Sequence, residues 1–192
     1  MLDLDNTLVD RRGAFTTWAS NFVAGLDGDS SDLEWLIAAD RDGYRPRAEL
    51  AALIRERFGL NTSVAHLVDR LRHELLEHIE AYPGVLQALD TLVGSGAVLV
   101  VVTNGAVDQQ MRKLHRTGLL SYSPQPVISE AVGSKKPHRL IFDTALSQAE
   151  HRPEQSWMVG DHQAWPHPWT PVVTGPTTKD VLQQIMAKDH LR

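Results

Sequence analysis

The sequence predicts a doubly wound α/β fold with a mainly parallel sheet and a helical insertion near its start. A continuous, β-branched apolar run at residues 97–102 is typical of a strand covered on both faces of such a sheet. Strand and helix patterns alternate after it, whereas residues 11–80 show only helical periodicity. We therefore predict an α/β core made of residues 1–10 and 81–192, interrupted by a helical segment of residues 11–80.

Four helices are expected within the insertion. Apolar residues recur there at spacings of three and four, for example Phe15, Trp18 and Phe22, which places them on one helix face. Stretches rich in Gly, Asp and Ser separate the periodic segments and mark the helix ends. The predicted helices span roughly residues 12–25, 31–41, 47–58 and 63–79.

The core is expected to continue with alternating helices and strands. Helices are predicted at residues 85–93, 107–117 and 139–149, and strands at residues 97–102, 126–129 and 156–159. In doubly wound sheets, ligands bind beyond the carboxyl ends of the strands. Polar residues that end strands are therefore candidates for the site, and Asp3, Thr103 and Asp161 stand at such ends.

Composition excludes several partner classes. The 192-residue chain carries a formal net charge of -5, which argues against a nucleic-acid backbone or an anionic membrane as the main partner. It has no cysteine, so disulfides and thiolate chemistry are excluded, which fits a cytoplasmic protein. The longest apolar runs are too short to span a bilayer. We expect a small-molecule partner, and the sequence leaves open whether the chain is a monomer or a homodimer.

The first residues concentrate polar groups. Asp3, Asp5 and Thr7 alternate with leucines, and on a strand this spacing sets them along one line. Two carboxylates at one spot repel each other unless a cation or a proton neutralises them, and a divalent metal ion would do so. The alternative is an ordinary surface turn, because Asp, Asn and Thr are common turn residues.

Together with Lys136 on a loop, the strand ends assemble groups suited to phosphoryl transfer. A carboxylate can attack phosphorus to form an aspartyl-phosphate, and a neighbouring carboxyl can protonate the leaving oxygen and later deprotonate water. Mg²⁺ and a lysine can neutralise the equatorial oxygens. Since Mg²⁺ keeps several of its waters, two or three carboxylate or carbonyl contacts suffice to bind it.

Four motifs in order resemble those of the haloacid dehalogenase (HAD) superfamily hydrolases of the phosphatase kind. They are DLDNTLVD at residues 3–10, VTNG at residues 102–105, GSKKP at residues 133–137 and VGD at residues 159–161. The resemblance covers nearly the whole chain. It implies a Rossmann-like core with a helical cap inserted after the first motif, and it implies Mg²⁺ as cofactor.

The resemblance also implies catalytic roles. Asp3 would be the nucleophile and Asp5, two positions on, the general acid and base. Dehalogenase members lack a carboxylate at this second position because a halide needs no proton, so Asp5 favours phosphate esters over haloacids. Thr103 would hydrogen-bond the transferring phosphoryl group. Lys136 precedes Pro137, as the family lysine does, and is therefore preferred over Lys135.

Further residues are expected to bind substrate and metal. Thr7, Asn104 and Gly105 are assigned to substrate binding by the same resemblance. Asp161 would complete the Mg²⁺ site together with Asp3 and the backbone carbonyl of Asp5.

The expected function is Mg²⁺-dependent hydrolysis of small phosphate monoesters, with nucleoside monophosphates and sugar phosphates as candidate substrates. A phosphomutase using the same intermediate is one alternative. A non-catalytic, phosphate-binding regulator is another, because the family places a further acid four or five positions after Asp161, where this chain has Trp165 and Pro166.

The chain has fewer residues than expected before the first motif and after the fourth. Only Met1 and Leu2 precede Asp3, whereas a central strand is about five residues long. We therefore expect that further residues precede the first motif. Residues missing between Asp161 and Ala164 would likewise explain the absent acid, with genuine loss of that acid as the alternative.

Overall fold

The computed structural model describes residues 1–161 and 172–173. The chain divides into two compact units, one formed by Met1–Asp10 with Glu80–Arg192 and the other by Arg11–Ile79. Within the part of the chain that is described, no helix has the length and apolarity needed to cross a membrane.

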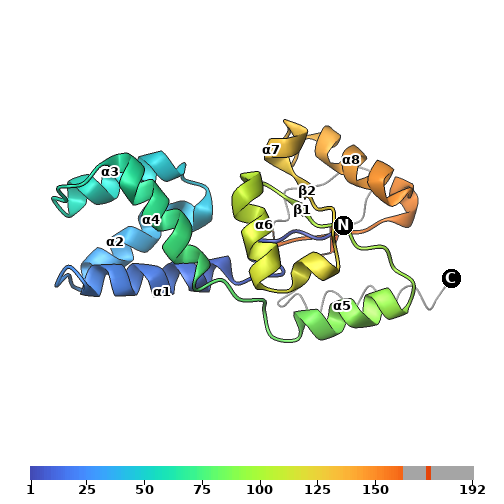
Figure 1. Ribbon diagram of the computed structural model, residues 1–192, viewed down its shortest axis with the longest axis horizontal. Helices are drawn as coiled ribbons and strands as arrows, with labels where there is room; N and C mark the ends of the chain where they lie inside the picture. Colours follow the sequence, from blue (N-terminus) through green and yellow to red (C-terminus); the bar gives the residue numbers. More distant parts are fainter. Residues whose placement is uncertain (162–171, 174–192) are drawn as a thin grey trace. The chain divides into compact units, whose positions relative to one another are not determined.

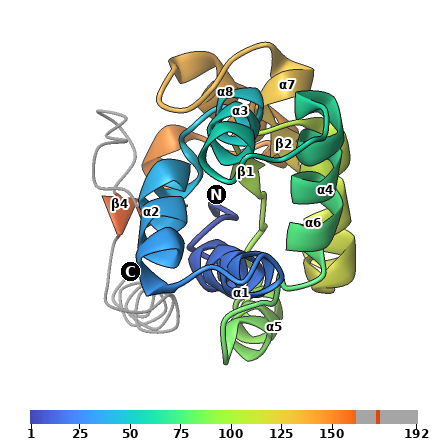
Figure 2. The ribbon, with the colours of Figure 1, turned by 90° about the vertical axis from the view of Figure 1, so that its left-hand side faces the viewer.

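The unit Arg11–Ile79 is helical. In Figure 2, α2 and α4 lie on opposite sides of α1, and both contact it. The ends of the first three helices fall within one residue of their predicted positions, whereas the fourth ends three residues earlier than predicted. The helices are α1 (Arg11–Ala24), α2 (Ser30–Asp40), α3 (Arg47–Arg57) and α4 (Val64–Leu76), with a short 3₁₀ helix at Arg41–Gly43.

Side-chain caps start two of these helices. The Asp29 carboxylate accepts hydrogen bonds from the backbone N–H groups of Ser31 and Asp32, and the Asp32 side chain accepts one from Asp29 N. Ser63 Oγ accepts a hydrogen bond from His66 N at the start of α4. Such caps satisfy N–H groups that have no partner within the helix, which explains why these helices begin where they do.

The other unit contains a parallel sheet. Strand β1 (Val102–Thr103) pairs with β2 (Val127–Ile128), and β3 (Met158–Val159) pairs with β4 (Val172–Val173). Leu2 forms parallel bridges to both Val101 and Val159, so the N-terminal segment lies between β1 and β3. This arrangement confirms the predicted parallel α/β class.

Helices flank this sheet. Ile141, Phe142 and Ala145 of α8 share one buried core cluster with valines of β1 and β2, and Figure 1 shows α8 beside these strands. The helices of this unit are α5 (Val85–Gly94), α6 (Val107–Arg116), α7 (Ser129–Val132) and α8 (Arg139–Ala149), with 3₁₀ helices at Leu119–Ser121 and Pro153–Gln155.

The predicted strand at residues 97–102 is wrong over most of its length. The strand β1 begins only at Val102, and Val98 is 53% exposed instead of being covered on both faces. The neighbouring N-terminal segment explains this result, because it pairs with the run only around Leu2. The Leu2 N–H donates a hydrogen bond to Val100 O, and the Leu2 carbonyl accepts one from Val102 N. An apolar run becomes a strand only where a partner strand accompanies it. The helix α7 was not predicted.

Candidate active site

Parallel pairing brings the ends of three segments to one edge of the sheet. Asp3 directly follows the bridging residue Leu2, and its backbone N–H donates to Val159 O at 2.8 Å. Thr103 is the last residue of β1, and Asp161 follows β3 by two positions. The three polar strand ends that the sequence singled out therefore lie at the same edge.

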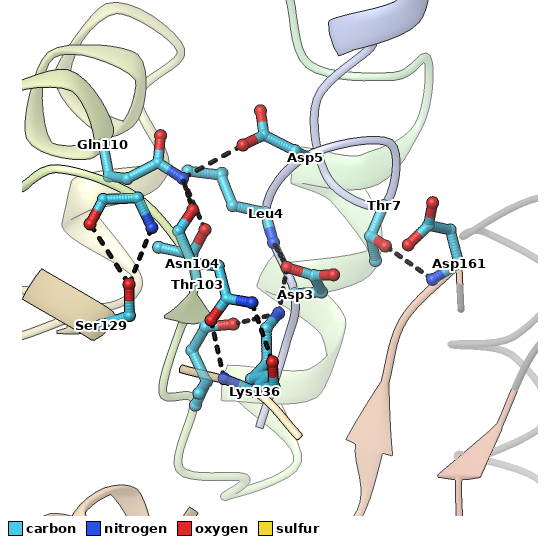
Figure 3. A network of polar contacts seen from close by, with 12 residues as sticks. Asp3, Leu4, Asp5, Thr7, Thr103, Asn104, Gln110, Ser129, Lys136 and Asp161 are labelled. Atoms are coloured by element: carbon cyan, nitrogen blue, oxygen red, sulfur yellow. Dashed lines mark hydrogen bonds and ion pairs between the residues drawn. The ribbon is translucent and has the colours of Figure 1, made fainter. Parts of the chain in front are cut away.

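A tight loop follows Asp3 and shapes the first motif. The backbone N–H groups of Leu8 and Val9 both donate to Leu4 O, and Asn6 adopts a left-handed conformation with φ 57°. Asn tolerates this conformation better than most residues. The loop buries Thr7, whose Oγ1 accepts a hydrogen bond from Asp161 N at 3.0 Å. Thr7 therefore joins the first motif to the fourth (Figure 3).

Asp3 and Lys136 form a buried ion pair. Lys136 Nζ donates to Asp3 Oδ1 at 2.5 Å and to Val102 O at 2.8 Å, and Leu4 N donates to the same Oδ1 at 2.7 Å. Burial raises the pKa of Asp3 to about 6, although the lysine acts in the opposite direction. Burial also lowers the pKa of Lys136, again against its ionic partner. Lys135, by contrast, is exposed.

Asn104 fixes the backbone of the lysine loop. Its Nδ2 donates to Lys136 O at 3.1 Å, and its Oδ1 accepts from Lys136 N at 2.8 Å. Both ends of the amide are thus used on one residue of the third motif. In this structure the Asn104 side chain positions Lys136.

Two residues of α6 bind Asp5, although none of the four sequence motifs contains them. Lys113 Nζ lies 2.6 Å and 2.8 Å from the two carboxylate oxygens of Asp5. Gln110 Nε2 donates to Asp5 Oδ2 at 3.1 Å and to Thr103 Oγ1 at 2.6 Å. Both residues lie in the helix predicted at residues 107–117, and their spacing of three residues places them on one face of it. This shared face was the signal in the sequence that could have pointed to the pair.

Gly105 provides room for Gln110. Its φ is +153°, a conformation that other residues rarely adopt, and an added Cβ would lie 3.0 Å from Gln110 Cγ and Cδ. Gly105 N donates to Ser129 Oγ at 2.9 Å, which holds the loop after β1 against the start of α7.

The donor set fits Mg²⁺. Both side-chain hydrogen bonds of Asp3 use Oδ1, and within the described part of the chain Oδ2 accepts none although the residue is 4% exposed. Asp161 is exposed and acts electrostatically on Lys136. No three His, Cys, Asp or Glu side chains of the described residues gather as a metal cluster. The expected set of two carboxylates, from Asp3 and Asp161, and the Asp5 carbonyl stays a prediction. Three oxygen ligands from the protein suffice for Mg²⁺, because this ion keeps several of its water ligands when it binds.

The positions expected to carry the further acid of the fourth motif are Trp165 and Pro166. Both lie outside the described residues, as does the segment between Asp161 and Ala164 where missing residues were expected.

Several known proteins are similar to this chain. A glyceraldehyde 3-phosphate phosphatase of Methanopyrus kandleri is 36% identical over 177 residues, with 84% of this chain and 74% of that protein covered. A pyrimidine 5'-nucleotidase of Escherichia coli is 38% identical over 104 residues, which span 53% of this chain and only 45% of that protein.

Solved structures share the fold. A Thermotoga maritima protein assigned as a β-phosphoglucomutase superposes with a TM-score of 0.74 at 16% identity, with 97% of each chain covered. A Bacillus subtilis protein assigned as a HAD hydrolase, solved with bound magnesium, gives a TM-score of 0.68 at 21% identity, with 84% of this chain and 78% of that chain covered. The sequence profile described as haloacid dehalogenase-like hydrolase matches residues 1–164, and the chain therefore belongs to that family.

Proposed function

We propose that this chain is a Mg²⁺-dependent phosphatase that hydrolyses small phosphate monoesters through an aspartyl-phosphate on Asp3. The observation that carries the proposal is the hydrogen bonding of the Asp3 carboxylate, which within the described residues uses only one of its two oxygens. Its Oδ1 is held by Lys136 Nζ and Leu4 N, while Oδ2 accepts no hydrogen bond from the described residues. A buried carboxylate oriented through one oxygen keeps the other available for attack or for a metal ion.

The proposed reaction has two steps. An Asp3 oxygen forms a bond to phosphorus while the ester P–O bond breaks, and the Asp5 carboxyl gives its proton to the leaving alkoxide. Water then attacks phosphorus and gives a proton to Asp5 as the bond between Asp3 and phosphorus breaks. The products are the free Asp3 carboxylate and inorganic phosphate, so the site returns to its starting state.

Lys136 and Thr103 would stabilise the transferring group. Lys136 is a fixed, buried cation beside the nucleophile, and such preorganised charge is worth more than the same charge in water. Bound Mg²⁺, held by Asp3, Asp161 and the Asp5 carbonyl, would neutralise charge on the phosphoryl oxygens. The magnesium bound to the Bacillus subtilis structure supports this choice of metal.

The relatives suggest the substrate class. They are named for a phosphorylated three-carbon sugar and for pyrimidine nucleotides, and both are phosphate monoesters. We propose that the unit Arg11–Ile79 acts as the cap that selects among such substrates, because lids in many enzymes close over the site and exclude water.

The test is a phosphate-release screen over sugar phosphates and nucleoside monophosphates, run with Mg²⁺, with chelator and with the Asp3→Asn variant. We expect release that needs both Mg²⁺ and Asp3. Activity that survives Asp3→Asn would refute the nucleophile. Transfer of phosphate to a sugar instead of water would identify a phosphomutase, and phosphate binding without any turnover would identify a regulator.

A further inference from the structure

Gln110 lies at the centre of the polar network and is 2% exposed. Its Nε2 carries two hydrogens and lies within hydrogen-bond distance of three acceptors that share them, namely Asp5 Oδ2 at 3.1 Å, Thr103 Oγ1 at 2.6 Å and Asn104 O at 3.0 Å. A carboxylate and a backbone carbonyl can only accept hydrogen bonds, so the amide nitrogen must face them and the orientation of the side chain is determined. One amide group thus connects three residues of the first and second motifs.

Lys113 supplies the second contact to Asp5. Its side chain is 13% exposed, and its ammonium binds both carboxylate oxygens. An ion pair on the open surface contributes little, but here one partner is largely buried and the carboxylate is also bound by Gln110. The two contacts come from one face of α6, so they restrict the Asp5 side chain together.

The bond from Gln110 also orients the Thr103 hydroxyl. When a hydroxyl oxygen accepts a hydrogen bond, its own hydrogen is directed away from the donor and can be donated elsewhere. Thr103 is 1% exposed, and Gln110 approaches from the side of Asp5 (Figure 3). A single residue therefore contacts both the Asp5 carboxyl and the Thr103 hydroxyl, to which the proposed function gives the proton transfer and the contact with the phosphoryl group.

We propose that Gln110 and Lys113 are positioning residues that hold the Asp5 carboxyl at the leaving oxygen of the substrate during phosphoryl transfer. This inference rests on the proposed function, in which Asp5 gives a proton to the leaving alkoxide as Asp3 bonds to phosphorus. A general acid works only when its carboxyl is within hydrogen-bond reach of that oxygen. Loss of either contact loosens the restraint on the Asp5 side chain without removing any group that would touch phosphorus.

The dependence on the leaving group separates this role from a structural one. An alkoxide is strongly basic and needs a proton as it departs, whereas p-nitrophenolate departs without one. The variant Lys113→Met should therefore lower kcat/KM for glycerol 2-phosphate by about tenfold to a hundredfold, and for p-nitrophenyl phosphate by less than about threefold. Gln110→Leu also removes the hydrogen bond to Thr103, so it should lower both rates, with the larger loss on glycerol 2-phosphate. Lys113→Arg, which keeps the cation, should restore most of the lost activity.

Arg112→Met is the matched control, because Arg112 directly precedes Lys113 in α6 and forms its ion pair with the exposed Asp108. It should leave both rates unchanged. Thermal melts by circular dichroism establish that each variant folds. If Gln110→Leu does not fold, Gln110→Asn keeps the amide but shortens its reach, and the same contrast between substrates is expected.

Equal losses on the two esters, or no loss on either, would overturn the positioning role. Failure of the proposed function is a different result, because it appears in the unmodified chain as an absence of Asp3-dependent phosphate release.

Discussion

The Lys136 ammonium and the Asp3 carboxylate lie 2.5 Å apart although 133 positions separate the two residues in the chain. Their side chains are only 1% and 5% exposed. Water can therefore solvate neither charge if its partner is lost, and the removal of one partner from a buried pair costs more than the removal of both. The pair connects the start of the chain to the third motif energetically as well as spatially.

Lys136→Met should destabilise the protein and abolish most of its activity. The substitution leaves the Asp3 carboxylate buried without a counter-charge, which costs about 3–5 kcal/mol in comparable buried pairs. Urea unfolding followed by circular dichroism measures this change. If Asp3 is the nucleophile, as proposed, activity on a phosphate ester should fall by about a hundredfold or more, because a preorganised cation beside it is lost.

Lys135→Met is the matched control for this change. It removes the neighbouring lysine, which is exposed, and should alter neither stability nor turnover. The double variant Asp3→Asn with Lys136→Met should be more stable than Lys136→Met alone. A double variant that is less stable than the single one would show that the two charges are not coupled.

Asn104→Ala should weaken the attachment of the lysine loop. The change removes both hydrogen bonds to the Lys136 backbone and leaves its N–H and C=O without these partners, at a cost of about 1–3 kcal/mol. The change should also raise the rate of amide hydrogen exchange at Lys136, which mass spectrometry of the intact chain can follow. Unchanged protection at Lys136 would contradict this role for Asn104.

The fold class could be predicted from sequence because its signals are local. The apolar periodicity of α1 and α2 and the glycines near helix ends follow from side-chain spacing and backbone preference alone. The edge of the sheet where Asp3, Thr103 and Asp161 meet could also be predicted, because the ends of parallel strands must lie on one side.

The details of the site could not be predicted because they depend on long-range contacts. Gln110 and Lys113 look like ordinary polar residues of a helix until the fold brings α6 to Asp5, more than a hundred positions earlier. The exposure of Val98 has the same origin, since an apolar run does not reveal how much partner strand accompanies it.

Gly105→Ala should displace Gln110. The new Cβ would lie 3.0 Å from two carbons of that side chain, and the φ of +153° would be strained for alanine. We expect a loss of about 1–3 kcal/mol in the free energy of unfolding. If Gln110 positions Asp5, activity on an alkyl phosphate should fall more than activity on p-nitrophenyl phosphate.

Gly94→Ala is the control for this prediction. Gly94 is the last residue of α5 and does not adopt a positive φ, and a Cβ added there would meet no atom of the described residues within 4 Å. Alanine there should be neutral or stabilising by up to about 1 kcal/mol. A similar loss of stability at both glycines would mean that the close approach to Gln110 is not the cause.

The helical unit should lose stability in acid through Glu74. The Glu74 carboxylate accepts hydrogen bonds from Arg70 Nε at 2.7 Å and from Trp18 Nε1 at 2.9 Å. Burial alone would raise the pKa of Glu74, but these hydrogen bonds outweigh burial and hold the pKa below its ordinary value of 4.5. The unfolded chain therefore binds this proton more tightly than the folded chain does. The stabilisation is fully present above that ordinary pKa and is lost as the pH falls through the folded value.

The measurement compares the free energy of unfolding of the unmodified chain and of Glu74→Gln across this pH range. The unmodified chain should be the more stable at neutral pH, and the difference should shrink as the solution becomes more acidic than the ordinary pKa of the group. Glu56→Gln, which removes a carboxylate from an exposed position of α3, is the matched control. A difference for Glu74→Gln that stays constant with pH would show that the Trp18 and Arg70 contacts do not depend on the charge of Glu74.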